Sequence, residues 1–421
     1  MKKYLLFLLM LLTLVFVGCG KKNGGYEPAA IDGFGRRISG EYYSKAEASM
    51  EEPTGVILPD EGEVDIPEEE NQELPQSGQL TSSVVFDNDH YDFWKSLITK
   101  GQEEGLLYRY RDTYKFDTTN RIKINTNGLV GAKVIIDNKY SGQTDSNGIV
   151  YLFPKEKDSY QLEITYKDVN GKTVTIKETI TGDYEFTPEE ASIKKNLLQI
   201  AFVIDTTGSM GDEIRYLQSE ITNVISRVKE DNANIDIELA LVFYRDHGDD
   251  YVTKTSDFSK DIDKQKKELE KQRADGGGDW EEAVQEGFKK ANKLSWKEEA
   301  KTKLLIWVAD APCHAKDVDD VIDEVNEFAK NGIRVITVAS SGIDKGTEFL
   351  FRSICLQTNG CYGYLTNDSG IGGDHVEATT EEKPTVEYLN NMLVRLINGF
   401  YSGEFSEAIP WRGQDYKPEE K

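Results

Sequence analysis

The 421-residue sequence predicts an α/β fold: a doubly wound, mainly parallel sheet, preceded by a small all-β sandwich and a disordered acidic tether. Three observations lead to this prediction. From residue 197 onward, continuous apolar segments alternate with amphipathic ones, which is typical of buried parallel strands between helices. Residues 121–187 hold short segments separated by turn residues, and residues 19–82 are rich in proline and acidic residues.

The overall charge argues against several partners. The formal net charge of -25 disfavours nucleic acid, because phosphate binding needs a basic face, and it disfavours electrostatic docking on an anionic membrane. The chain also lacks a glycine-rich phosphate loop followed by lysine. We therefore expect neither nucleic acid nor nucleotide as a partner.

Residues 1–18 predict a lipoprotein signal peptide. Lys2 and Lys3 precede an apolar run from Tyr4 to Val17, which is shorter than the roughly 20 apolar residues that a spanning helix needs. The tetrapeptide that ends at Cys19 resembles a bacterial lipobox, and this resemblance implies lipidation of Cys19. We expect a lipid anchor in the membrane and exposure on the outer side of the cytoplasmic membrane, at the cell surface or in the periplasm. A cleaved signal peptide without lipid, or a short uncleaved anchor, is the alternative.

The next segments differ in composition. Residues 19–82 predict a disordered linker, because their prolines and acidic residues leave too little apolar area to offset the entropy of ordering. Residues 83–120 are aromatic again and predict a short helical segment that packs on a neighbouring domain. Residues 402–421 predict a C-terminal tail.

Residues 121–187 predict the β-sandwich, because short strands recur between turn sequences. This segment resembles the carboxypeptidase regulatory-like, transthyretin-like modules. The turn at Asp145 and Asn147 suggests a calcium loop, but too few oxygen ligands follow for a complete shell. We interpret it as a hairpin turn.

Residues 197–401 predict the α/β domain. Its expected strands are Leu198–Ile204, Ile237–Tyr244, Tyr251–Asp257, Leu304–Ala309, Ile333–Ala339 and Tyr362–Leu365. Amphipathic helices are expected between them, one of them beginning near Trp280. In such sheets, ligands bind at the carboxyl ends of the strands.

Oxygen-bearing side chains follow the first of these strands. Asp205, Thr207 and Ser209 are spaced so that one loop can direct a carboxylate and two hydroxyls to one point, and Asp310 follows the strand Leu304–Ala309. Oxygen ligands suit a hard cation such as Mg²⁺. The alternative is a helix N-cap, in which a hydroxyl satisfies free backbone amides.

This arrangement resembles the metal-ion-dependent adhesion site of von Willebrand factor A domains, which have a Rossmann-like fold. Asp205, Thr207 and Ser209 match the first loop of that motif, and Asp310 matches its last aspartate. The resemblance implies a divalent cation, Mg²⁺ first with Mn²⁺ and Ca²⁺ as alternatives, and a protein ligand whose Asp or Glu completes the shell. The glycine-rich segment at residues 276–284 narrows the resemblance to the A domains found beside α-kinases.

Asp279 stands where the family has threonine. A carboxylate there would contact the cation, directly or through water, and would make it less electrophilic, so we include Asp279 in the predicted site. The alternative is a capping box, in which Asp279 and Glu282 begin a helix.

The histidines and cysteines leave alternatives open. With Asp246 and Asp249 nearby, His247 and His314 either form a second metal site, contact the ligand, or are loop residues hydrogen-bonded to the backbone, and we favour the last. Cys313 beside His314 is a poor nucleophile candidate, since sequence neighbours rarely point together. A disulfide or two buried thiols fit the last two cysteines equally, Cys355 and Cys361.

Together these patterns predict a non-enzymatic lipoprotein of the cell envelope that binds a protein ligand through a divalent cation. A metal-independent envelope scaffold is the first alternative. The second is a hydrolase that uses Asp310, His314 or Cys313.

Overall fold

The computed structural model describes residues 74–101, 106–232 and 234–412. The predicted signal peptide, Cys19 and most of the predicted linker lie outside these residues, as do residues 413–421. Within the described part of the chain, no helix is both long and apolar enough to cross a bilayer.

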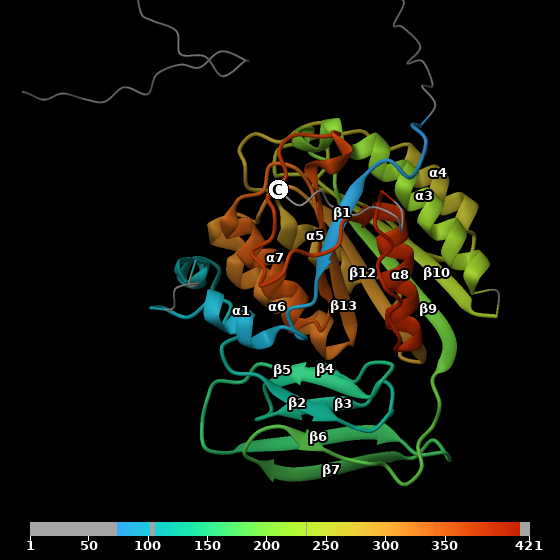
Figure 1. Cartoon of the computed structure of the whole chain (residues 1–421). Helices are drawn as coiled ribbons and strands as arrows, with labels where there is room; N and C mark the ends of the chain where they lie inside the picture. The colour runs from blue at the N-terminus through green and yellow to red at the C-terminus, as the bar shows by residue number, and fades with distance from the viewer. Residues whose placement is uncertain (1–73, 102–105, 233, 413–421) are drawn as a thin grey trace, which may run out of the picture. The chain divides into compact units, whose positions relative to one another are not determined.

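The main sheet has eight strands in the order β11-β10-β9-β12-β13-β14-β1-β15 (Figure 1). The five central strands are parallel: β10 (Asp236–Tyr244), β9 (Lys195–Asp205), β12 (Ala300–Ala309), β13 (Ile333–Ala339) and β14 (Cys361–Leu365). Antiparallel strands complete both edges: β11 (Thr253–Ser259), β1 (Thr81–Val85) and β15 (Glu387–Tyr388). The predicted mainly parallel α/β sheet is therefore confirmed.

Helices cover both faces of this sheet, so its central strands are buried on two sides. One face packs on α1 (Tyr91–Leu97), α5 (Val284–Asn292), α6 (Val318–Lys330) and α7 (Lys345–Gln357). The other packs on α3 (Ile214–Asp231), α4 (Ile262–Glu270) and α8 (Leu389–Ser402). Alternate residues of a central strand pack into the hydrophobic cores on opposite faces of the sheet. The sequence of each central strand is therefore continuously apolar.

Trp307 of β12 shows how tightly the first core packs. Its ring centroid lies 4.1 Å from that of Phe351 and 4.8 Å from that of Phe288. Its indole N–H donates to the Tyr244 hydroxyl at 3.0 Å, so the one polar atom of the side chain is satisfied. This hydrogen bond links β12 to β10 across the intervening strand β9, below the strand ends that carry polar residues.

An all-β region precedes the parallel strands of the main sheet in sequence, as predicted. It contains a three-stranded sheet, β5-β2-β8, and a four-stranded sheet, β4-β3-β6-β7. Their bounds are Ile122–Asn125 (β2), Lys133–Ile136 (β3), Tyr140–Gln143 (β4), Ile149–Leu152 (β5), Tyr160–Lys167 (β6), Thr173–Ile180 (β7) and Tyr184–Glu185 (β8). The Asp145 carboxylate accepts from the N–H groups of Asn147 (2.9 Å) and Ile149 (2.8 Å), which supports the hairpin-turn interpretation.

Strand β1 differs from the prediction, because the expected end of the linker at residue 82 falls inside it. The polar residues of β1 are buried and satisfied: the Thr81 hydroxyl donates to the Thr366 carbonyl, and the Ser83 hydroxyl to the Thr385 carbonyl. The N–H groups of Gly78 and Gln79 donate to Glu220 of α3 at 2.7 and 2.8 Å. A strand that begins with three small polar residues shows no alternation of apolar and polar residues, so the sequence pattern did not predict it.

Candidate metal centre

The predicted cation ligands lie where two neighbouring parallel strands end. Asp205 is the last residue of β9, and Asp310 directly follows β12. The two strands pair in register up to Ile204 and Val308, so their next residues arrive at the same edge of the sheet. This edge is the carboxyl end of the sheet, where ligands bind in folds of this kind.

Asp205, Thr207, Ser209 and Asp310, which we name the Asp205 group, are held together by hydrogen bonds. One Asp205 oxygen accepts from the Thr207 N–H (2.9 Å) and the Thr207 hydroxyl (2.6 Å). The Thr207 and Ser209 hydroxyls are 3.2 Å apart, and Ser209 also hydrogen-bonds Asp310. Asp205 and Thr207 are fully buried, whereas Ser209 is exposed and opens the group to solvent.

The N-cap alternative is wrong for these hydroxyls. Thr207 precedes the short 3-10 helix η2 (Gly208–Asp212), but its side chain makes no capping hydrogen bond, and Ser209 lies inside η2. The N-cap of α3 is Glu213, which likewise makes no side-chain cap. The loop therefore directs its hydroxyls toward the carboxylates and not toward free backbone amides.

The Asp205 group has oxygens that the protein leaves without partners. Asp205 Oδ2 and Asp310 Oδ1 are buried and accept no hydrogen bond. Burial raises the pKa of the Asp205 carboxyl, and burial together with the charge of Asp205 raises the pKa of Asp310. Unpartnered buried carboxylate oxygens are costly, and a hard divalent cation with oxygen ligands would satisfy them.

A residue that the sequence interpretation did not place in the site, Glu282, joins this group. Its side chain is 2% exposed, it hydrogen-bonds the Thr207 hydroxyl, and its Oε2 has no partner. Burial raises the pKa of Glu282 to about 9, and three neighbouring charges contribute in the same direction. They belong to Asp205, Asp246 and Asp310. Glu282 is thus a further buried carboxylate available to a cation.

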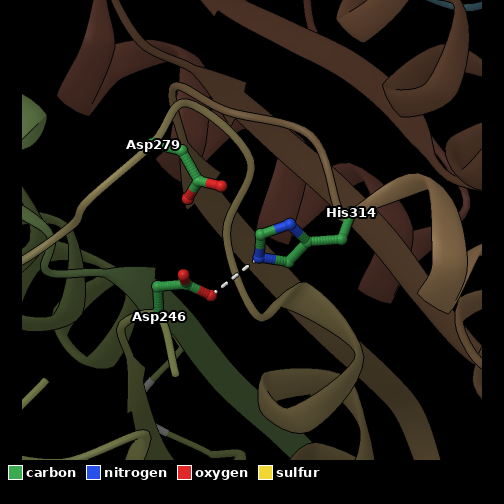
Figure 2. Close-up of side chains that lie close together, drawn as sticks. All are labelled: Asp246, Asp279 and His314. Atoms are coloured by element: carbon green, nitrogen blue, oxygen red, sulfur yellow. Dashed lines mark hydrogen bonds and ion pairs between the residues drawn. The ribbon is translucent and has the colours of Figure 1, made fainter. Parts of the chain in front are cut away.

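The helix start predicted near Trp280 requires a correction. The predicted helix near Trp280 begins at Val284 with Ala283 as its N-cap, so Asp279 and Glu282 form no capping box. The physical reason is that the Glu282 N–H donates to the Pro312 carbonyl (2.9 Å), which keeps the chain extended beyond Asp279. Asp279 is exposed and lies beside Asp246 and His314 (Figure 2). The structure therefore brings Glu282, and not Asp279, to Thr207.

The distances also constrain how a cation would be held. Among the described residues, the carboxylates of Asp205, Asp310 and Glu282 do not form a set whose ligand atoms all lie within 4.8 Å of one another. Mg²⁺ binds readily through a few protein oxygens while keeping several waters. Some of these carboxylates would then reach the cation through water.

The histidines contact side chains and not the backbone that the sequence interpretation favoured. His314 Nε2 lies 2.9 Å from Asp246 Oδ1, and His247 contacts the Gln285 side chain. The alternative of a second metal site therefore stays open. Burial raises the pKa of Cys313 to about 12, which keeps it a thiol and gives a nucleophile no support. The remaining two cysteines are free and buried: Cys355 and Cys361.

The family model of the von Willebrand factor A domain matches residues 199–371, a segment that contains every residue of this centre. The chain therefore contains a von Willebrand factor A domain. Two curated proteins are similar to part of this chain. One is the alpha-protein kinase vwkA of Dictyostelium discoideum, 27% identical over an alignment of 207 residues that covers 45% of this chain and 32% of the kinase. The other is an ariadne-like RING finger protein, R811, of Acanthamoeba polyphaga mimivirus, 33% identical over 132 residues, or 31% of this chain and 13% of that protein.

These matches cover less than a third of the length of either relative. Among solved structures, the chain is similar to an aerotolerance-related membrane protein from Bacteroides fragilis NCTC 9343, crystallised with multiple mutations to serines. That match has 15% identity and a TM-score of 0.30, and it covers 49% of this chain and 98% of the other.

The different positions of Glu282 and Asp279 give a direct test of the centre. Glu282→Gln should weaken Mg²⁺ binding at least tenfold, about 1.4 kcal/mol, because it removes a buried carboxylate beside Thr207. The matched variant Asp279→Asn should leave Mg²⁺ binding nearly unchanged, because that carboxylate lies in another cluster. Calorimetric titration of both variants with Mg²⁺ measures the difference, and the opposite order of effects would contradict this assignment.

Proposed function

We propose that the A domain is a binding module that holds a divalent cation, Mg²⁺ first, at the Asp205 group and presents it to a protein ligand. The observation that carries the proposal is the pair of unpartnered buried oxygens on Asp205 and Asp310, next to the exposed hydroxyl of Ser209. Von Willebrand factor A domains commonly mediate protein–protein interactions. We assign this domain binding and no turnover.

The charge of the centre limits how a partner can bind. Asp205, Asp310 and Glu282 bring three carboxylates to one divalent cation, which leaves one formal negative charge when all are ionised. A partner's Asp or Glu would meet a less electrophilic cation than in a shell with two carboxylates. Such a partner therefore needs further contacts, and Trp280, 43% exposed in the loop that leads to Glu282, offers an aromatic anchor of the kind enriched at interfaces.

Cation binding is tested by thermal unfolding of a chain that begins at residue 74, first in EDTA and then with increasing Mg²⁺, Mn²⁺ or Ca²⁺. Binding to the native state alone stabilises it by about 2.7 kcal/mol at a hundredfold excess over the dissociation constant. Asp205→Ala should abolish the shift, whereas the exposed control Asp368→Ala should keep it. If no cation raises the unfolding temperature, and a partner is captured equally well in EDTA, the metal-independent scaffold replaces this proposal.

We further propose that the domain is displayed outside the cytoplasmic membrane by a lipid on Cys19. The support is the lysine-led apolar run that ends at the lipobox-like tetrapeptide and the acidic linker that follows it. Cys19→Ser should move the protein from the membrane fraction to the soluble fraction after cell lysis. Unchanged membrane association of that variant would contradict the lipid anchor.

A further inference from the structure

Three polar side chains outside the Asp205 group converge on one point. Asp246 follows β10, Asp279 lies in the glycine-rich loop before α5, and His314 follows β12. Each offers one ligand atom, and these atoms lie within 4.8 Å of one another. Figure 2 shows the three side chains directed toward a common space, with His314 hydrogen-bonded to Asp246. We name them the His314 group.

The loops that carry this group are fastened to each other. The Asp249 carboxylate accepts from the Asp246 N–H at 3.1 Å and from the Gly277 N–H at 3.0 Å. It therefore joins the loop after β10 to the loop that leads to Asp279. Outer contacts of this kind orient the ligands of a metal site before the metal arrives.

Exposure differs across the group in a way that suits an entry path. Asp246 is 8% exposed, His314 is half-buried and Asp279 is exposed. A cation can thus enter from the solvent side, and Asp279 would be the last protein ligand to close on it. Three protein ligands would leave open positions for water or a partner group.

A buried carboxylate lies beside this group as well as beside Thr207. The backbone of Glu282 pairs with Cys313, the neighbour of His314, and the Glu282 side chain is 2% exposed with one oxygen that has no partner. The five carboxylates of this edge carry up to five negative charges: Asp205, Asp246, Asp279, Glu282 and Asp310. One divalent cation at the Asp205 group offsets only two of them. A second cation would offset two more.

We propose that Asp246, Asp279 and His314 bind a second divalent cation, of the class that prefers mixed nitrogen and oxygen ligands, with Zn²⁺ first. An imidazole with carboxylates suits Zn²⁺ and Co²⁺, whereas the oxygen-only Asp205 group suits Mg²⁺. The two groups therefore select different metals at neighbouring positions. This second site does not depend on cation binding by the Asp205 group.

The test uses Co²⁺ as a visible probe for the full chain in the presence of excess Mg²⁺. A single equivalent of Co²⁺ should give a saturable d–d absorption band that Zn²⁺ displaces. His314→Gln should abolish the band, and Asp279→Asn, at an exposed position that folding does not require, should weaken Co²⁺ binding at least tenfold. The matched control His247→Gln, a neighbouring histidine outside the group, should keep the band, with far-UV circular dichroism confirming that each variant is folded.

Two results would overturn the second site. One is the absence of a saturable band in the unaltered chain, which would leave His314 and Asp246 as a hydrogen-bonded pair that only fastens two loops. The other is a band that survives both His314→Gln and Asp279→Asn. Asp205→Ala should keep the Co²⁺ band while losing the stabilisation by Mg²⁺, so failure at one group is distinguishable from failure at the other.

Discussion

The parallel pairing of β9 with β12 determines which side chains meet at the carboxyl end of the main sheet. Because the two strands are parallel neighbours, Asp205 and Asp310 arrive side by side at the end of a sheet that is buried on both faces. Two carboxylates in such a place do not both ionise without a compensating charge. Hydrogen bonds from Thr207 and Ser209 satisfy only part of their oxygens. The fold thus leaves carboxylate oxygens of Asp205 and Asp310 without hydrogen-bond partners, and a cation can bind to them.

The glycine-rich loop before α5 decides which residues share that position. The Gly208 N–H donates to the Gly276 carbonyl at 3.1 Å, which lays this loop across the one after β9. Gly276 has a φ of +80°, and a Cβ there would lie 2.4 Å from the Asp249 carboxylate, so only glycine allows the approach. The chain then runs extended to Glu282, and this path sends Asp279 to one group and Glu282 to the other.

The sequence carried enough information for the central sheet and the first loop of the site. Continuous apolar segments predicted β13 with its observed bounds, and the amphipathic segments between the strands predicted helices. The spacing of Asp205, Thr207 and Ser209 predicted a loop that the structure shows to be hydrogen-bonded. These features depend on local periodicity and on the rule that parallel strands end at one edge.

Features that depend on contacts between distant parts of the chain could not be predicted from local sequence patterns. The polar start of β1 is stabilised by partners 285 and 302 residues away, Thr366 and Thr385. Helical periodicity placed a helix start near Trp280, whereas pairing with the segment after β12 delays it to Val284. The choice between Asp279 and Glu282 followed from that helix start, so the same long-range contact decided it.

The central claim is that the Asp205 group binds a divalent cation. A crystal structure of the chain grown with Mn²⁺, with an anomalous difference map recorded for manganese, tests it most directly. The account predicts a peak beside Asp205 and Asp310, with Ser209 among the ligands and water completing the shell. A map without a peak at this group, with both carboxylates bonded only to protein, would contradict it.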